Sequence, residues 1–181
     1  MATQSIPERA AAVTFRGSPM TLVGAELHAG DPAPTFSLTT TSLEAYTLEA
    51  ATDGGKRAVL LIAVPSLDTG VCSKETDTFY RRLGELPAGV VAAVVSLDLP
   101  FAQARWAAEH GVEESLVFLS AYREHDFGAS YGILIKELGL LARAEFVIAK
   151  DGTLAYANVV PEVASEPDYD RTLAAAAKAA T

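Results

Sequence analysis

Residues 58–72 read Ala58-Val-Leu-Leu-Ile-Ala-Val64 and then Pro65-Ser-Leu-Asp-Thr69-Gly-Val-Cys72. Seven consecutive apolar residues are typical of a central β-strand that is covered on both faces. Pro65 ends that strand, because proline has no N–H to donate to a neighbouring strand. A helix is expected from about Thr69 to Leu83. Cys72 is therefore predicted to lie at a strand-to-helix junction.

The rest of the chain alternates strand and helix patterns around this segment. Further strands are expected at 90–97 and 116–119, with hairpins at 13–23 and at 144–159 around Asp151-Gly152. Helices are expected at 101–109, at 126–131 and from about 167 onward. This order predicts an α/β fold with a central mixed sheet and helices on both faces. We expect residues 1–12 to be a flexible N-terminal segment and residues 13–181 to form a single domain.

Composition narrows the classes of function. Half of the 181 residues are hydrophobic and the net charge is −9, which argues against nucleic acid as a partner. His28, His110 and His125 lack the spacing of metal ligands, so no metal or other cofactor is expected. We see no signal peptide and no apolar run of the roughly 20 residues that cross a bilayer. The sequence thus predicts a cytoplasmic protein without a membrane partner.

Cys72 is the only cysteine, so an intrachain disulfide is excluded and any redox role requires a second molecule. If Thr69 caps the helix, Cys72 falls in the first turn, where free N–H groups and the helix dipole stabilise an anion. That position favours the thiolate, whereas an unperturbed thiol is only about 3% ionised at pH 7. A nucleophile there also needs a hydroxyl and a cation to stabilise the charge on a leaving group. Thr69 supplies a hydroxyl, but the residues alone do not choose among the arginines. The plain alternative is a buried structural thiol.

The pattern Pro65-x-x-x-Thr69-x-x-Cys72 resembles the peroxidatic signature of the peroxiredoxins. Other segments are similar to the bacterial thiol peroxidase subfamily. They are Met20–Val23, the spacing Gly30-x-x-Ala33-Pro34-x-Phe36, Asp98-Leu-Pro-Phe-Ala-Gln103, Tyr131-Gly132, Gly139-Leu-Leu-Ala-Arg-Ala144 and Glu166-Pro-Asp-Tyr169. The similarity runs from about Val13 to the C-terminal helix.

The resemblance implies a thioredoxin fold with an added N-terminal β-hairpin, in a homodimer. It implies a thiol-dependent peroxidase that reduces alkyl hydroperoxides and hydrogen peroxide, with Cys72 becoming a sulfenic acid. In that family pattern Thr69 hydrogen-bonds the thiolate and the peroxide, and Pro65 shields the sulfur. The resemblance also implies that Arg143 is the cation.

Two positions depart from the subfamily pattern, and the lesser one is Asp77, where the resemblance often places arginine. Ala107 stands where the resemblance places a second, resolving cysteine. The sulfenic acid must then be reduced by an external thiol, such as a small thiol, a thioredoxin-like protein or a second subunit. The sequence leaves open whether Ala107 is natural or replaces a removed cysteine.

Two other functions are compatible with a thiol at this place. A peroxide-sensing redox relay or binding protein would pass oxidation to a partner as a mixed disulfide, with little turnover, and the missing second cysteine favours it. A disulfide reductase on a thioredoxin fold is disfavoured, because the chain has no Cys-x-x-Cys pair.

Overall fold

The structure, a computed structural model, describes residues 6–124 and 126–181. His125 and the first five residues of the expected flexible segment lie outside the described residues. A seven-stranded mixed sheet forms the centre, in the order β11-β10-β5-β6-β7-β3-β4. Its strands are β3 (Ser37–Thr40), β4 (Ala45–Thr47), β5 (Ala58–Ala63), β6 (Val90–Ser96), β7 (Leu116–Ser120), β10 (Ala144–Ile148) and β11 (Leu154–Val159).

The apolar run from Ala58 occupies the middle of this sheet, as predicted. Strand β5 pairs in parallel with β6 and antiparallel with β10, and all six of its residues are buried. Strand β6 in turn pairs in parallel with β7. A continuous hydrophobic run is what a strand covered on both faces requires.

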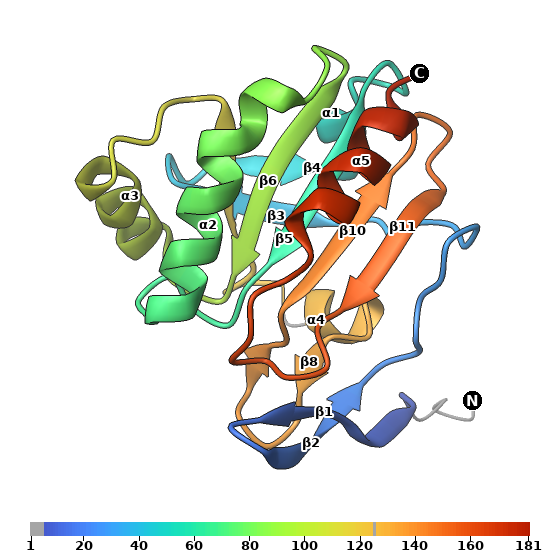
Figure 1. The fold of residues 1–181 in the computed structure, drawn as a ribbon, viewed down its shortest axis with the longest axis vertical. Helices are drawn as coiled ribbons and strands as arrows, with labels where there is room; N and C mark the ends of the chain where they lie inside the picture. The colour runs from blue at the N-terminus through green and yellow to red at the C-terminus, as the bar shows by residue number, and fades with distance from the viewer. Residues whose placement is uncertain (1–5, 125) are drawn as a thin grey trace.

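Helices cover both faces, which confirms the predicted α/β arrangement (Figure 1). One layer contains α2 (Gly70–Arg82), α3 (Pro100–Glu109) and α5 (Tyr169–Ala179), and a short 3-10 turn, η1 (Leu83–Glu85), follows α2. Side chains of these three helices, Phe79, Trp106 and Leu173, share one buried cluster with Cys72. The other face is covered by α1 (Leu48–Thr52) and α4 (Phe127–Ser130), which contribute to a second cluster.

The N-terminal hairpin belongs to a separate four-stranded sheet. It joins β1 (Glu8–Phe15) and β2 (Ser18–Val23) to β8 (Leu134–Ile135) and β9 (Leu140–Leu141). The hairpin itself was predicted. Its pairing with β8 was not, because two-residue strands carry no readable alternation.

The first strand begins five residues earlier than expected. Residues 8–12, assigned from sequence to the flexible segment, are part of β1, so that boundary is corrected. The side chain of Arg9 holds these residues against the rest of the fold, because its guanidinium donates to Gly24 O at 3.1 Å and also to Gly132 O. One side chain thus holds this strand to the end of β2 and to the turn after α4.

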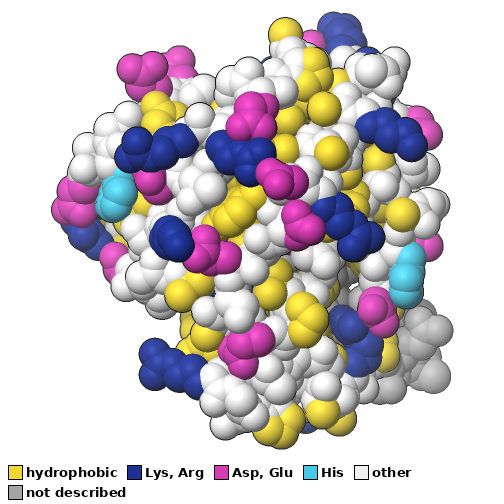
Figure 2. Space-filling view, in the orientation of Figure 1, with side chains coloured by type: hydrophobic (Ala, Val, Ile, Leu, Met, Phe, Trp, Pro, Cys, Tyr) yellow, Lys and Arg dark blue, Asp and Glu magenta, His cyan; other side chains and the backbone are white. Residues whose placement is uncertain are grey.

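The surface carries charges of both signs. On the face shown in Figure 2, Lys and Arg side chains lie among Asp and Glu and form no continuous basic area. Among the helices of the described chain, none combines the length and the apolar character needed to cross a bilayer.

Candidate active site

Cys72 lies in the first turn of α2, after the loop of residues 64–69 that follows β5 and contains Pro65. Thr69 is the N-cap with extended backbone angles, and its Oγ1 accepts a hydrogen bond from Cys72 N at 3.4 Å. The predicted cap is therefore present. The Thr69 hydroxyl donates to Ser66 O at 3.1 Å, so in this structure its proton is directed to the loop and not to the sulfur.

Arg143 immediately precedes β10, the strand next to β5, and its side chain reaches the thiol. Its Nη2 donates to Cys72 Sγ at 3.2 Å, a contact between residues 71 positions apart in the chain. Its Nε donates to Val163 O at 3.0 Å, which fixes the plane of the guanidinium. Both side chains are buried, with Arg143 1% exposed and Cys72 0% exposed. The structure thus brings together the thiol and the arginine that the resemblance selected.

Glu75 is a member of the site that the sequence did not single out. Its Oε2 accepts a hydrogen bond from Arg143 Nη1, and its side chain is 0% exposed. A buried guanidinium needs a partner of opposite charge, because burial of an unpaired charge is very costly. The signal was available: Glu75 lies three residues after Cys72, so both project from the same side of one helix.

A cavity of about 360 Å³ lies against the thiol and is lined by Cys72, Thr69, Pro65 and Arg143 together. All four candidate residues therefore border one space. The remaining wall is largely apolar. It includes Phe15 of the hairpin, Ile135, Leu138, Leu140 and Val163. Arg16, at the turn of the hairpin, also lines it and is exposed.

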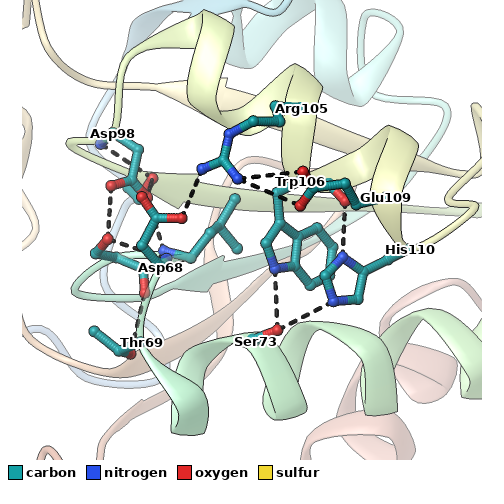
Figure 3. Close-up of polar contacts among 11 residues, drawn as sticks. Asp68, Thr69, Ser73, Asp98, Arg105, Trp106, Glu109 and His110 are labelled. Carbon is teal, nitrogen blue, oxygen red and sulfur yellow. Dashed lines mark hydrogen bonds and ion pairs between the residues drawn. The ribbon is translucent and has the colours of Figure 1, made fainter.

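Asp98 holds the loop between β5 and α2. Its carboxylate accepts from Ser66 Oγ at 2.8 Å and from Leu67 N at 2.8 Å, and a further 2.8 Å bond comes from Ser96 Oγ (Figure 3). These bonds satisfy polar groups that the turn leaves without strand or helix partners. The loop that carries Thr69 is thereby fixed to the end of β6.

The start of α2 is also tied to α3. Trp106 Nε1 donates to Ser73 Oγ at 3.0 Å, and the His110 ring stacks on Trp106 at 3.9 Å between centroids (Figure 3). Arg105 pairs with Asp68 at 2.9 Å, one residue before the cap. Cys72 is thus flanked by residues whose side chains are anchored to the neighbouring helix.

Ala107, the position of the absent second cysteine, is on α3 and half-buried. It packs against the buried cluster that contains Cys72, and it lines a different hollow from the thiol. Cys72 is a free thiol. Within residues 6–124 and 126–181, no group of three or more His, Cys, Asp or Glu side chains is arranged to hold a metal ion.

Comparison with known proteins identifies the family of this chain. Residues 28–173 match the family model described as Redoxin. A peroxiredoxin-like protein from Aquifex aeolicus superposes with a TM-score of 0.85 at 38% identity, covering 94% of this chain and 99% of that one. The chain therefore belongs to the Redoxin family, and the thioredoxin fold expected from the sequence is confirmed.

Two curated relatives define the family more narrowly. Thiol peroxidase from Streptococcus sanguinis is 48% identical over 162 residues, covering 90% of this chain and 96% of the relative. Thiol peroxidase from Bacillus subtilis strain 168 is 41% identical over 166 residues, covering 92% and 96%. Within the Redoxin family, the chain belongs to the thiol peroxidase subfamily of the peroxiredoxins.

Proposed function

We propose that this protein is a thiol-dependent peroxidase whose nucleophile is the thiolate of Cys72. The observation that carries the proposal is the 3.2 Å contact between Arg143 Nη2 and Cys72 Sγ in the first turn of α2, beside an apolar cavity. Free N–H groups of a first helical turn and a buried guanidinium both stabilise an anion. Its thiol peroxidase relatives support the same activity.

The reaction follows from these groups. The Cys72 sulfur attacks the terminal oxygen of a hydroperoxide, so that an S–O bond forms and the O–O bond breaks. Sulfur is oxidised by two electrons to a sulfenic acid, and the peroxide is reduced to an alkoxide that takes a proton from water. Arg143 stabilises the negative charge as it moves from sulfur to the leaving oxygen, which is where fixed donors lower a barrier most.

Thr69 and Pro65 have supporting roles in the proposal. Rotation of the Thr69 hydroxyl from Ser66 O toward the cavity lets it donate to an incoming peroxide oxygen. Pro65 lines the same space with a ring that offers no N–H to water. The apolar wall around them favours alkyl hydroperoxides over hydrogen peroxide, because an alkyl chain buries surface there.

An external thiol completes the cycle, because position 107 is alanine and Cys72 is the only sulfhydryl in the chain. The thiolate of a small thiol or of a thioredoxin-like protein attacks the sulfenic sulfur. Hydroxide leaves and takes a proton to become water, and a mixed disulfide forms. A second thiol then attacks that disulfide, releasing Cys72 and an oxidised dithiol. We place this chemistry in the cytoplasm, where reduced thiols are abundant.

The test is consumption of an alkyl hydroperoxide in the presence of a small thiol or a thioredoxin system. We expect many equivalents of peroxide to be reduced per protein, and none above background by the Cys72→Ser variant. Activity retained in Cys72→Ser would refute the proposal.

A redox relay is the second candidate, and Ala107 is the observation that favours it. A relay would consume about one equivalent of peroxide and then stop, with the protein held as a mixed disulfide. The same turnover measurement separates the two functions, because only an enzyme continues when thiol is in excess.

We also propose that the chain forms a homodimer. Leu99 and Phe101, at the start of α3, are 51% and 66% exposed, and two neighbouring large apolar side chains on a surface favour association. Sedimentation of the protein and of Phe101→Glu tests this. A dimer that dissociates in the variant is expected, and a monomer at all concentrations would contradict it.

A further inference from the structure

A buried carboxylate that has no part in the proposed reaction lies next to the site. Glu145, on β10, is 0% exposed. Its Oε2 accepts a hydrogen bond from Asn158 Nδ2 at 2.7 Å, across the pair β10–β11. Its Oε1 has no hydrogen-bond partner among the described protein atoms. Glutamate is rarely fully buried without a cation bound directly to it, so this residue requires an explanation.

Glu145 lies on the same side of the sheet as the site. Ala144, Phe146 and Ile148 face the cluster on the opposite side, while Val147 belongs to the cluster of Cys72. Alternation therefore directs Glu145 toward the α2 and α5 layer. Arg143, two residues earlier, points to that side as well, and residues i and i+2 of a strand are about 7 Å apart.

Arg143 is consequently close to three acidic groups: the thiol of Cys72, the carboxylate of Glu75 and the carboxyl of Glu145. Glu75 Oε1, like Glu145 Oε1, has no hydrogen-bond partner among the described protein atoms. One positive charge thus faces up to three negative charges in a space from which water is largely excluded. Such a set cannot be fully ionised at low cost.

The surroundings of Glu145 contain other ionisable groups on each packed element. Arg143, before β10, acts on the charge of Glu145. Tyr156 on β11 lies near Glu145 and also near Asp168 and Arg171 at the start of α5. Glu75 on α2 shares the cation Arg143. Burial raises the pKa of Glu145 to about 7, and the bond from Asn158 and the charge of Arg143 offset only part of that rise. Glu145 is thus half-protonated near neutral pH.

We infer that Glu145 is a positioning residue that acts on Cys72 through Arg143, because both acids share this one buried guanidinium and a negative charge on either opposes a negative charge on the other. The effect of this coupling on the rate of peroxide reduction rests on the proposed function. When Glu145 ionises, its charge counteracts the stabilisation that Arg143 gives to the thiolate and to the leaving oxygen. Peroxide reduction then slows as the pH rises above neutrality.

Two titrations test the coupling without any turnover. Thiolate formation at Cys72 is followed by ultraviolet absorbance in the unsubstituted protein and in Glu145→Gln, and the single cysteine makes the signal unambiguous. The protonated carboxyl of Glu145 is followed by its infrared carbonyl band, which Glu145→Gln identifies by its loss, in the unsubstituted protein and in Cys72→Ser. Glu49→Gln, an equal change of charge at an exposed position of α1, is the matched control.

Coupling is reciprocal, so the group that ionises second should titrate at lower pH once its partner is removed. Two charges about 10 Å apart at an effective dielectric of about 20 shift an ionisation by about one pH unit, a tenfold change in the constant. We expect a shift of this size in one of the two curves, and none in Glu49→Gln.

Glu145→Val provides the second variant, because it is neutral but lacks the bond to Asn158. If the charge of Glu145, and not its bond to Asn158, acts on the thiol, Glu145→Gln and Glu145→Val give the same Cys72 absorbance titration. Unchanged curves for both groups would overturn the inference, and so would a shift in Glu145→Val without one in Glu145→Gln. Absence of peroxidase activity would instead refute the proposed function and leave the titration result standing.

Discussion

At the scale of single residues, the site depends on one guanidinium that serves three acceptors. Arg143 donates to the thiol of Cys72, to the carboxylate of Glu75 and to the carbonyl of Val163. The same side chain therefore stabilises the fold and the reacting sulfur. Substitution should affect stability and rate separately.

For Arg143→Gln we predict two losses. The second-order rate constant for peroxide reduction should fall roughly 10²- to 10³-fold, as on removal of a fixed donor to a developing anion. The free energy of unfolding should fall by about 3 kcal/mol, because Glu75 is left buried without its cation. The double variant Arg143→Gln, Glu75→Gln should recover stability but not rate. Denaturant unfolding measures the stability and stopped-flow kinetics measures the rate. Recovery of the rate in the double variant would contradict the role given to Arg143.

Glu145 predicts a dependence of stability on pH. The folded state raises the pKa of this carboxyl from 4.5 to about 7, so between these values the folded protein retains a proton that the unfolded chain has released. Stability is then lost as the pH rises through this window. As the pH rises from about 4 to about 8, the free energy of unfolding of Glu145→Gln should increase by up to about 3 kcal/mol relative to that of the unsubstituted protein. Urea unfolding at each pH tests this, and a constant difference would show that Glu145 is not the titrating group.

At the scale of elements, helix α2 carries the thiol, and its N-cap residue Thr69 stabilises the first turn in which the thiol lies. Thr69→Val removes the acceptor of the Cys72 N–H and should lower the free energy of unfolding by about 1 kcal/mol. Thr69→Ser keeps the hydroxyl and should leave the free energy of unfolding nearly unchanged. Peroxide reduction should decline in the valine variant and persist in the serine variant. Equal rates in both would show that the Thr69 hydroxyl has no part in the reaction.

Helix α3 offers a test of how oxidation is resolved. In Ala107→Cys we expect one equivalent of peroxide to convert two free thiols into an internal disulfide. The first turn of α2 must open for this, because Cys72 is fully buried and Ser73 is tied to Trp106. Thiol counting before and after oxidation measures it. One free thiol remaining, with a sulfenic acid at Cys72, would mean that the two helices do not approach each other.

At the scale of the whole molecule, the lone cysteine sets the fate of the oxidised protein. With excess peroxide and no thiol, Cys72 should progress from the sulfenic to the sulfinic acid, since no second thiol in the chain captures the first product. Intact mass spectrometry should show addition of two oxygen atoms, and Ala107→Cys should resist this. An unmodified mass would contradict the assignment of Cys72 as the oxidised group.

The sequence predicted the central sheet well and its additions less well. The apolar runs at 58–64 and 90–97 correspond to β5 and β6 because burial on both faces leaves an unbroken hydrophobic pattern. Strands β8 and β9 have two residues each, too few for a pattern, and β8 joins the hairpin by pairing with β2, which is distant in sequence. The same limit applies at the site: Thr69 and Cys72 are local in sequence, whereas the contact of Arg143 with the sulfur spans the fold.

The most direct test of the account mixes reduced protein with one equivalent of an alkyl hydroperoxide in the absence of any other thiol. The account predicts one alcohol released and one sulfenic acid formed at Cys72, at a rate reduced about 10²- to 10³-fold in Arg143→Gln. Alcohol release at an equal rate in Arg143→Gln, or in Cys72→Ser, would contradict it.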